Sequence, residues 1–230
     1  MDTGQPSIAP VLSPQPWYQV WMDAITKPNV EAYEALVSRP GVSMGRAILW
    51  VFASSLLGSA IALVMMFVFR GFDPLSSQTA PSGDPGSYLV SLACLAPVAA
   101  VVSVLGLMLI AGISHMVARA LGGSGTYPQL VYATAAYSSP ITLVSSVISS
   151  FPVVSCLGLP IALYAIFLNI LAVKAVHRIS WGRAVVSSTA VIAGLLALFA
   201  CVVIVLLALL GPAIGEVFSS VITELGTPSP

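Results

Sequence analysis

Long hydrophobic runs, separated by short polar or Pro/Gly-containing stretches, set the pattern of this chain. The first run, residues 47–69, carries no charge, and at 1.5 Å per residue it would form a helix about 34 Å long. That length is enough to cross a hydrocarbon core of about 30 Å. The pattern predicts an all-α, polytopic membrane protein with five transmembrane helices, at residues 47–69, 88–118, 130–149, 157–176 and 184–210.

A shorter amphipathic region precedes the first of these runs. The residues on its apolar face are Trp17, Tyr18, Trp21, Ala24 and Ile25, and after Pro28 the same spacing returns at Ala32, Tyr33, Leu36 and Val37. This spacing predicts two short amphipathic helices. Either they lie in the lipid headgroup layer, anchored by Trp17 and Trp21, or they pack as a cap on the membrane domain.

These patterns divide the chain into four parts. Residues 1–16 contain four prolines and no apolar core, so we expect a disordered tail rather than a signal peptide. Residues 17–45 form the amphipathic interfacial region, and residues 46–211 form the five-span membrane domain. Residues 212–230 are predicted to be a short exposed C-terminal segment.

The distribution of lysine and arginine predicts the orientation of the spans. If the N-terminus is cytoplasmic, seven of the eight basic residues lie inside and only Arg70 lies outside. The seven are Lys27, Arg39, Arg46, Arg119, Lys174, Arg178 and Arg183. The positive-inside rule therefore predicts a cytoplasmic N-terminus and a C-terminus on the outside.

Composition agrees with a membrane protein and narrows the partners. Charged residues make up 7% of the chain, against about 25% in soluble domains, so the chain lacks the residues for a polar shell. The lipid bilayer must be part of its solvent. The net charge is zero, so nucleic acid is not an expected partner. The three cysteines have no metal-ligand spacing, and we expect buried apolar thiols.

The glycine-rich stretch "GGSGTY" at residues 122–127 is the first place to look for chemistry. A phosphate-binding P-loop would need a lysine and a preceding strand, and this stretch has neither. It fits the C-terminus of a helix instead, where Gly122 or Gly123 takes a positive φ. Arg119 and His115 then lie in the last turns, where cations meet the negative end of the helix dipole.

Ser114, His115 and His177 are the remaining candidates for a reactive site. Ser114 in "GIS" would need a base within hydrogen-bond reach, and His177 is predicted on the same side of the membrane. Two histidines without a nearby carboxylate make a poor metal shell, so we expect rings that bond to water or to helix-end carbonyls. The sequence predicts no catalytic site, no metal site and no cofactor.

Residues 115–140, "HMVARALGGSGTYPQLVYATAAYSSP", resemble the signature of the Yip1-domain family of small multi-pass membrane proteins. The matching positions are His115, Gly122, Gly123, Gly125, Tyr127, Ala133, Ala136 and Pro140. The stretch "LNILAVKAVHRISWGRAVVSS" is similar to the last inner loop of the family, and "KPNVEAYEALVSRPGVSMGRAILW" is similar to the region before its first span. The resemblance covers most of residues 17–210.

The resemblance implies a five-span fold with a cytoplasmic N-terminal region. Eukaryotic members act in vesicle traffic and bind small GTPases of the Rab type, but their Asp-Leu-x-Gly-Pro element is absent here, and "DPGSY" at Asp84 is at most a remnant of it. The chain looks more like the prokaryotic branch of the family. Together with the low lysine content, this predicts a multi-pass protein of the bacterial plasma membrane.

The leading functional hypothesis is a non-enzymatic membrane protein that organises the membrane or recruits partners through its cytoplasmic face. Its partners would be other membrane proteins or a second copy of the chain. The residues expected to form the interaction surface are Trp17, Trp21, Arg119, Gly122, Gly123, Tyr127, His177 and Arg178.

The alternative hypothesis is a transporter or pore for a small neutral or lipidic solute. It would use Asn169, a strongly polar residue near the middle of the fourth span, and the serines Ser145, Ser146 and Ser149 of the third. Asn169 is more simply explained by a hydrogen bond to a neighbouring helix. Small residues four apart, such as Ser54 and Gly58, predict close helix packing, within the bundle or with another protein.

Overall fold

The computed structural model describes residues 15–69 and 85–226, and all regular structure in these ranges is helical. Two short helices, α1 (Trp17–Thr26) and α2 (Val30–Ser38), come first. The long helices are α3 (Met44–Phe69), α5 (Pro85–Ala120), α6 (Tyr127–Ser149), α7 (Gly158–His177) and α8 (Trp181–Gly226), and the 3-10 helix η1 (Pro152–Leu157) joins α6 to α7. Each long helix contains a segment that is long and apolar enough to cross a membrane. The chain is therefore a multi-pass membrane protein with the predicted spans.

The helices α1 and α2 form a hairpin around Lys27, Pro28 and Asn29. Proline has no N–H to donate and disfavours a helical residue before it, so α1 ends at Thr26. The side chain of Asn29 then caps α2 by accepting a hydrogen bond from the Ala32 N–H at 2.7 Å. Tyr33 is fully buried, and its hydroxyl donates to the Ala24 carbonyl at 3.0 Å, which ties α2 to α1.

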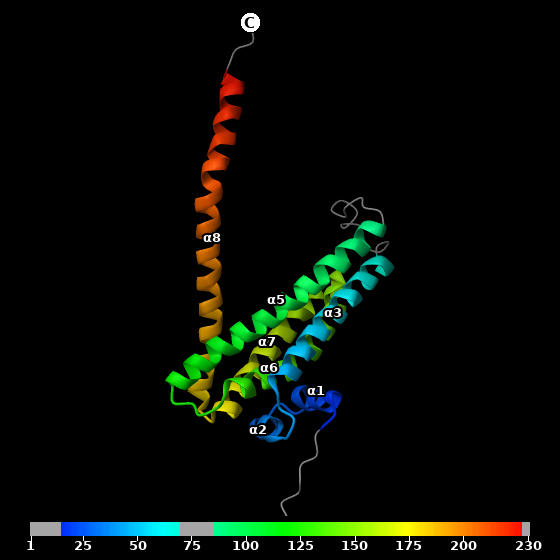
Figure 1. Ribbon diagram of the computed structural model, residues 1–230, viewed down its shortest axis with the longest axis vertical. Coiled ribbons are helices and arrows are strands. Elements are labelled where there is room, and N and C mark those ends of the chain that lie inside the picture. Colours follow the sequence, from blue (N-terminus) through cyan, green and yellow to red (C-terminus); the bar gives the residue numbers. More distant parts are fainter. Residues whose placement is uncertain (1–14, 70–84, 227–230) are drawn as a thin grey trace, which may run out of the picture. The chain divides into compact units, whose positions relative to one another are not determined.

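This hairpin packs on the membrane helices, which is the second of the two arrangements that the sequence allowed. Helix α1 contacts α6, and α2 contacts α6 and α7 (Figure 1). The Tyr164 hydroxyl on α7 donates to the Ile25 carbonyl at the end of α1. Trp21 of α1 meets the ring of Trp50 on α3 edge to face, with ring centroids 6.2 Å apart. The hairpin is thus a cap on the bundle.

Helix α6 is the centre of the bundle, and its first half is buried on every side. Eight consecutive residues, from Leu130 to Tyr137, are buried, which spans more than two turns and leaves no exposed face. Its second half packs closely against α3, because a Cβ on Gly58 would lie 2.6 Å from the Ser146 hydroxyl oxygen. The predicted small-residue spacing at Gly58 therefore serves packing within the bundle.

The helix α8 belongs to two parts of the structure. Its first turns, through Ser188, form one compact unit with the preceding helices, and residues from Thr189 onward form a second unit. In the first unit Ala184 is fully buried, and the Ser187 hydroxyl donates to the Ser114 carbonyl of α5 at 2.7 Å. In the second unit the helix continues through Pro212 to Gly226, so residues 212–226 are helical.

Candidate functional site

The glycine turn after α5 is a helix-ending motif. The N–H of Gly122 donates to the Arg119 carbonyl at 3.0 Å, and the N–H of Gly123 donates to the Ala118 carbonyl at 2.8 Å. Gly122 has a φ of +90°, which glycine adopts without a steric cost. These two bonds and this dihedral angle define a Schellman C-cap. The sequence prediction for this turn is confirmed, and Gly122 is the residue with positive φ.

Gly123, Ser124 and Gly125 hold the turn against the end of α7. A Cβ on Gly123 would lie 2.8 Å from the Cβ of His177, and a Cβ on Gly125 would overlap the Val176 carbonyl group. The Ser124 N–H donates to the His177 carbonyl at 3.2 Å. Gly123 and Gly125 are therefore required for close approach between two segments, rather than for a special dihedral angle.

The start of α6 is fixed to both the turn and α5. The Gln129 side chain accepts hydrogen bonds from the Thr126 N–H at 3.2 Å and from the Thr126 hydroxyl at 2.9 Å, which caps the helix. The hydroxyl of Tyr127 donates to the Met108 carbonyl of α5 at 3.0 Å. The ring of Tyr127 also contacts His115 edge to face.

His115 and His177 contact each other at this junction. The Nδ1 atom of His115 lies 3.3 Å from the Nε2 atom of His177, within hydrogen-bond distance. His177 is 1% exposed, while His115 is partly exposed. One of the two contacting nitrogens must carry a lone pair, so the two rings cannot both be protonated while this bond exists. We expected bonds to water or helix-end carbonyls for these rings; the structure instead pairs them with each other.

The end of α7 and the start of α8 complete the junction. Arg178 ends α7 with a φ of +54°, and its N–H donates to the Lys174 carbonyl at 2.8 Å. Lys174 lies over the ring of Trp181 and reaches the Ile179 carbonyl. Arg183 donates to the Leu121 carbonyl of the glycine turn at 3.1 Å. We call this set of helix ends and the turn the inner junction, after the side of the membrane that the lysine and arginine distribution predicts for it.

Comparison with known proteins gives one result. The family model of the Yip1 domain matches residues 22–204, from within α1 to within α8. The chain belongs to the Yip1-domain family. Comparison with curated proteins and comparison with solved structures each give no match. The match includes the inner junction and the hairpin from Met22 onward, so Trp17 and Trp21 lie outside it.

The predicted interaction residues fall into two groups. Trp17 and Trp21 lie on α1, where their rings stack edge to face with centroids 4.9 Å apart. The other six belong to the inner junction: Arg119, Gly122, Gly123, Tyr127, His177 and Arg178. Within that group, Gly123 and His177 are buried, whereas Arg119, Gly122 and Arg178 are exposed. The buried members hold the junction together, and the exposed members lie on its surface.

Ser114 does not form the serine–histidine contact considered from the sequence. Its side chain is fully buried, and its hydroxyl oxygen has no hydrogen-bond partner among the described residues. Its carbonyl accepts the bond from Ser187. Within residues 15–69 and 85–226, no three His, Cys, Asp or Glu side chains are placed to hold a metal ion. The buried thiols expected from the sequence are also not observed, since Cys94 and Cys156 are exposed.

Asn169 makes the interhelical contact expected of it. The Tyr137 hydroxyl on α6 donates to the Asn169 amide oxygen on α7 at 3.2 Å. Two of the third-span serines bond within their own helix: Ser146 donates to the Thr142 carbonyl at 2.8 Å and Ser149 donates to the Ser146 carbonyl at 3.3 Å.

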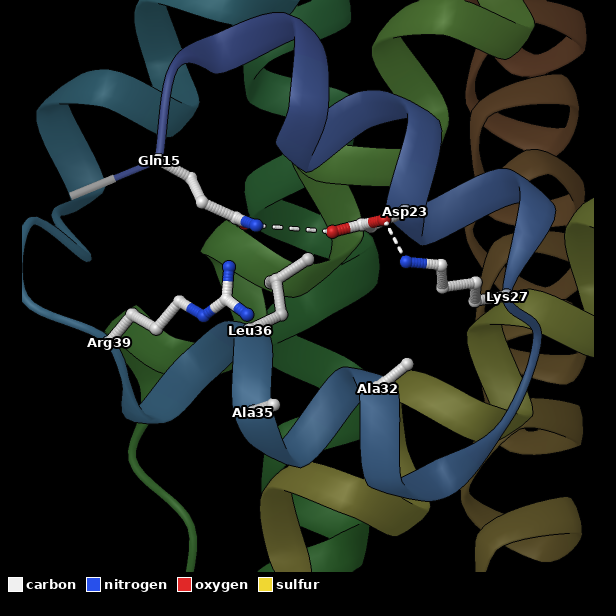
Figure 2. Close-up of a pocket in the computed structure, with 7 residues that line it drawn as sticks. All are labelled: Gln15, Asp23, Lys27, Ala32, Ala35, Leu36 and Arg39. Carbon is white, nitrogen blue, oxygen red and sulfur yellow. Dashed lines mark hydrogen bonds and ion pairs between the residues drawn. The ribbon is translucent and has the colours of Figure 1, made fainter. Parts of the chain in front are cut away.

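A pocket between α1 and α2 is the feature that sequence reasoning missed. It has a volume of about 110 Å³, and its lining residues are Gln15, Asp23, Lys27, Ala32, Ala35, Leu36 and Arg39 (Figure 2). Asp23 binds Lys27 at 2.8 Å and accepts a bond from Gln15 at 3.2 Å. The Arg39 side chain extends into the space between the helices, and its Nε atom is buried without a hydrogen-bond partner among the described residues (Figure 2).

Proposed function

We propose that this Yip1-family protein is a non-enzymatic protein of the bacterial plasma membrane that recruits partner proteins or organises the membrane through its cytoplasmic face. The observation that carries this proposal is the attachment of the α1–α2 hairpin to the bundle. Tyr33 joins the two helices and Tyr164 joins the hairpin to α7. A surface held in this way is presented in one orientation, which lowers the ordering cost of binding a partner.

The pocket of the hairpin gives this surface its chemistry. Asp23, Lys27 and Arg39 supply charges of both signs around a floor that includes Leu36. An unpaired guanidinium nitrogen loses the water that it would bind in solution, so a ligand that accepts its hydrogen bond recovers this loss. A protein segment with a carboxylate or a carbonyl group beside a small apolar side chain fits this lining.

The inner junction supports the same reading from a second position. Its contacts are backbone hydrogen bonds, the contact between the two histidine rings and the hydrogen bond from Arg183 to the Leu121 carbonyl, and they connect the ends of α5 and α7 with the starts of α6 and α8. Such a junction provides a rigid support for the exposed residues Arg119 and Arg178 rather than an arrangement of nucleophile and base. The buried Ser114 hydroxyl, without a hydrogen bond to either histidine, agrees with this view.

The solute-pathway alternative receives less support from the geometry. The Asn169 amide oxygen accepts a hydrogen bond from Tyr137. Ser146 donates a hydrogen bond to the Thr142 carbonyl and lies opposite Gly58, where α3 and α6 pack together. These polar groups join helices or bond within one helix. They therefore act in packing, as hydroxyl and amide groups commonly do between membrane helices.

Quantitative affinity purification from native membranes tests the proposal. We expect Arg39→Gln to reduce the yield of a stoichiometric partner protein by roughly tenfold, because one charge-assisted hydrogen bond contributes about 1.5 kcal/mol or more. The matched control is Glu31→Gln, which changes an exposed charge in the first turn of α2 that does not line the pocket. The proposal fails if no stoichiometric partner is found with the wild type, or if both variants retain it equally.

A further inference from the structure

Four basic residues belong to the inner junction and form what we call the basic patch: Arg119, Lys174, Arg178 and Arg183. They come from three helices that the junction brings together. Arg119 lies in the last turn of α5. Arg183, in the first turn of α8, donates a hydrogen bond to the carbonyl of Leu121, two residues after Arg119. Lys174 and Arg178 are one turn apart at the end of α7, where the Arg178 N–H donates to the Lys174 carbonyl.

The basic patch has no acidic counterpart in the described part of its own unit. The acidic residues described there are Asp23, Glu31 and Glu34, all on the hairpin. The ion pair found among the described residues joins Lys27 to Asp23 and involves none of the four. The side chains of Lys174 and Arg183 donate hydrogen bonds only to backbone carbonyls, and Lys174 also lies over the Trp181 ring. Neither Arg119 nor Arg178 makes a side-chain hydrogen bond to a described residue. Four positive charges are therefore left for an external anion.

The depth of the patch indicates which anion can reach it. The spans in α5 and α7 end at Ala120 and His177, and the span in α8 begins at Trp181. Each of the four basic residues lies within about one turn of one of these ends, which places them at the level of the lipid headgroups. Trp181 is 49% exposed beside Lys174, as expected for an aromatic residue at a membrane interface. Phosphate groups of lipids are the anions present at this depth.

The backbone of Arg178 is a second, independent observation. It has a φ of +54°, in the left-handed region that a helix-ending residue often adopts but that glycine or asparagine fills with less strain. An arginine at this position adds a positive charge but also introduces local backbone strain. Its exposed side chain makes no hydrogen bond, ion pair or ring contact with a described residue. This choice of residue is explained if the guanidinium group binds something outside the protein.

We infer that the basic patch at the inner junction binds the phosphate headgroups of anionic phospholipids in the adjoining leaflet. Arginine binds phosphate oxygens with paired hydrogen bonds, and Lys174 adds a fourth positive charge from the side of α7. Basic pockets between membrane helices are suited to such headgroups. None of the four residues lines the hairpin pocket, so the inference does not depend on that pocket. Arg119 and Arg178 also belong to the predicted interaction surface, and here they are assigned to lipid instead of protein.

Lipid retention by the purified full-length protein tests the inference. Native mass spectrometry in a neutral detergent would compare retained phosphatidylglycerol with retained phosphatidylcholine. We expect a preference for phosphatidylglycerol in the wild type, and a loss of roughly 25-fold in its affinity for the double variant Arg178→Gln with Arg183→Gln, because each basic residue contributes about fivefold. The matched control is Lys27→Gln with Arg39→Gln, which removes the same charge from the hairpin and should keep the preference.

A further variant separates lipid binding from folding. Arg178→Gly removes one charge and relieves the strained dihedral angle, so we expect unchanged or higher thermal stability together with about fivefold weaker phosphatidylglycerol binding. The inference is overturned if this variant binds as the wild type does, or if the hairpin control loses as much as the junction variant. It is also overturned if millimolar inorganic phosphate displaces the lipid completely, which would indicate a free phosphate site, or if the patch retains only a protein.

Discussion

The Nδ1 atom of His115 lies 3.3 Å from the Nε2 atom of His177, so that two imidazole rings join the end regions of α5 and α7. The glycine turn covers this contact, because a Cβ on Gly123 would lie 2.9 Å from the Nδ1 atom of His177. The position of the turn, and with it the start of α6, therefore depends on this histidine pair. The predictions below follow from this dependence and from the packing of the hairpin.

Removing the two rings should reveal coupling between them. We expect His177→Ala to lower the free energy of unfolding by about 2 kcal/mol, because a fully buried ring leaves a cavity. His115→Ala should cost about 1 kcal/mol, since this ring is partly exposed and loses one hydrogen bond. Unfolding in detergent of both single variants and the double variant measures the coupling, which we expect to be about 1 kcal/mol. Strictly additive losses would mean that the ring contact contributes nothing.

Two glycines of the turn, Gly122 and Gly125, should differ in their tolerance of a methyl group. We expect Gly125→Ala to be the most harmful, at about 3 kcal/mol, because the new Cβ would overlap the backbone of Val176. Gly122→Ala should cost about 1 kcal/mol through its positive φ alone. The control is Gly112→Ala in α5, where a Cβ meets nothing within 4 Å and helix propensity favours alanine. Thermal unfolding in detergent gives the order of the stability losses. Equal losses for Gly112→Ala and Gly125→Ala would refute the close approach of Gly125 to Val176.

The hairpin should loosen at high pH through Tyr33. Burial raises the pKa of the Tyr33 phenol above its ordinary value of about 10, so the folded hairpin favours the neutral form. The resulting stabilisation is present below about pH 10 and is lost as the pH rises above it. Hydrogen exchange of α1 and α2 at about pH 8 and pH 10.5 measures this loss.

Two variants isolate the contribution of Tyr33. Tyr33→Phe should cost about 1 kcal/mol at pH 8, because the bond to the Ala24 carbonyl is lost, but it should make protection less sensitive to high pH. Tyr18→Phe, at an exposed position on α1, should leave the pH response unchanged. An unchanged pH response in Tyr33→Phe would contradict the assignment.

Sequence patterns were sufficient wherever the physical cause is local. The five apolar runs, the break at Pro28 and a positive φ at Gly122 or Gly123 each follow from a few consecutive residues, and the structure assigns the positive φ to Gly122. For the amphipathic region, the same pattern allowed two placements. The structure decides in favour of the cap, because Tyr33 and Tyr164 bond to the backbone of α1 across helices that the pattern could not bring together.

Contacts between distant parts of the chain could not be predicted in this way. His115 and His177 are 62 positions apart, and nothing in either local stretch specifies that the rings meet. The sequence indicates a turn at Gly125, but the structure shows that the absence of a side chain at Gly125 allows close packing against the Val176 carbonyl. The i,i+4 spacing of Asp23 and Lys27 was the one local indication of the hairpin pocket. The pocket also depends on Arg39 at the end of α2, whose position beside α1 is set by the fold. Tertiary packing determines all three features.

Site-specific photo-crosslinking in native membranes tests the central claim most directly. A photoreactive residue at Ala35 would face the hairpin pocket, and one at Met22, an exposed position that does not line the pocket, would serve as the comparison. The account predicts a discrete protein adduct from Ala35 that disappears with Arg39→Gln, and no such adduct from Met22. If Ala35 yields only lipid adducts, or the same adducts as Met22, the hairpin does not recruit a protein partner and the proposed function is wrong.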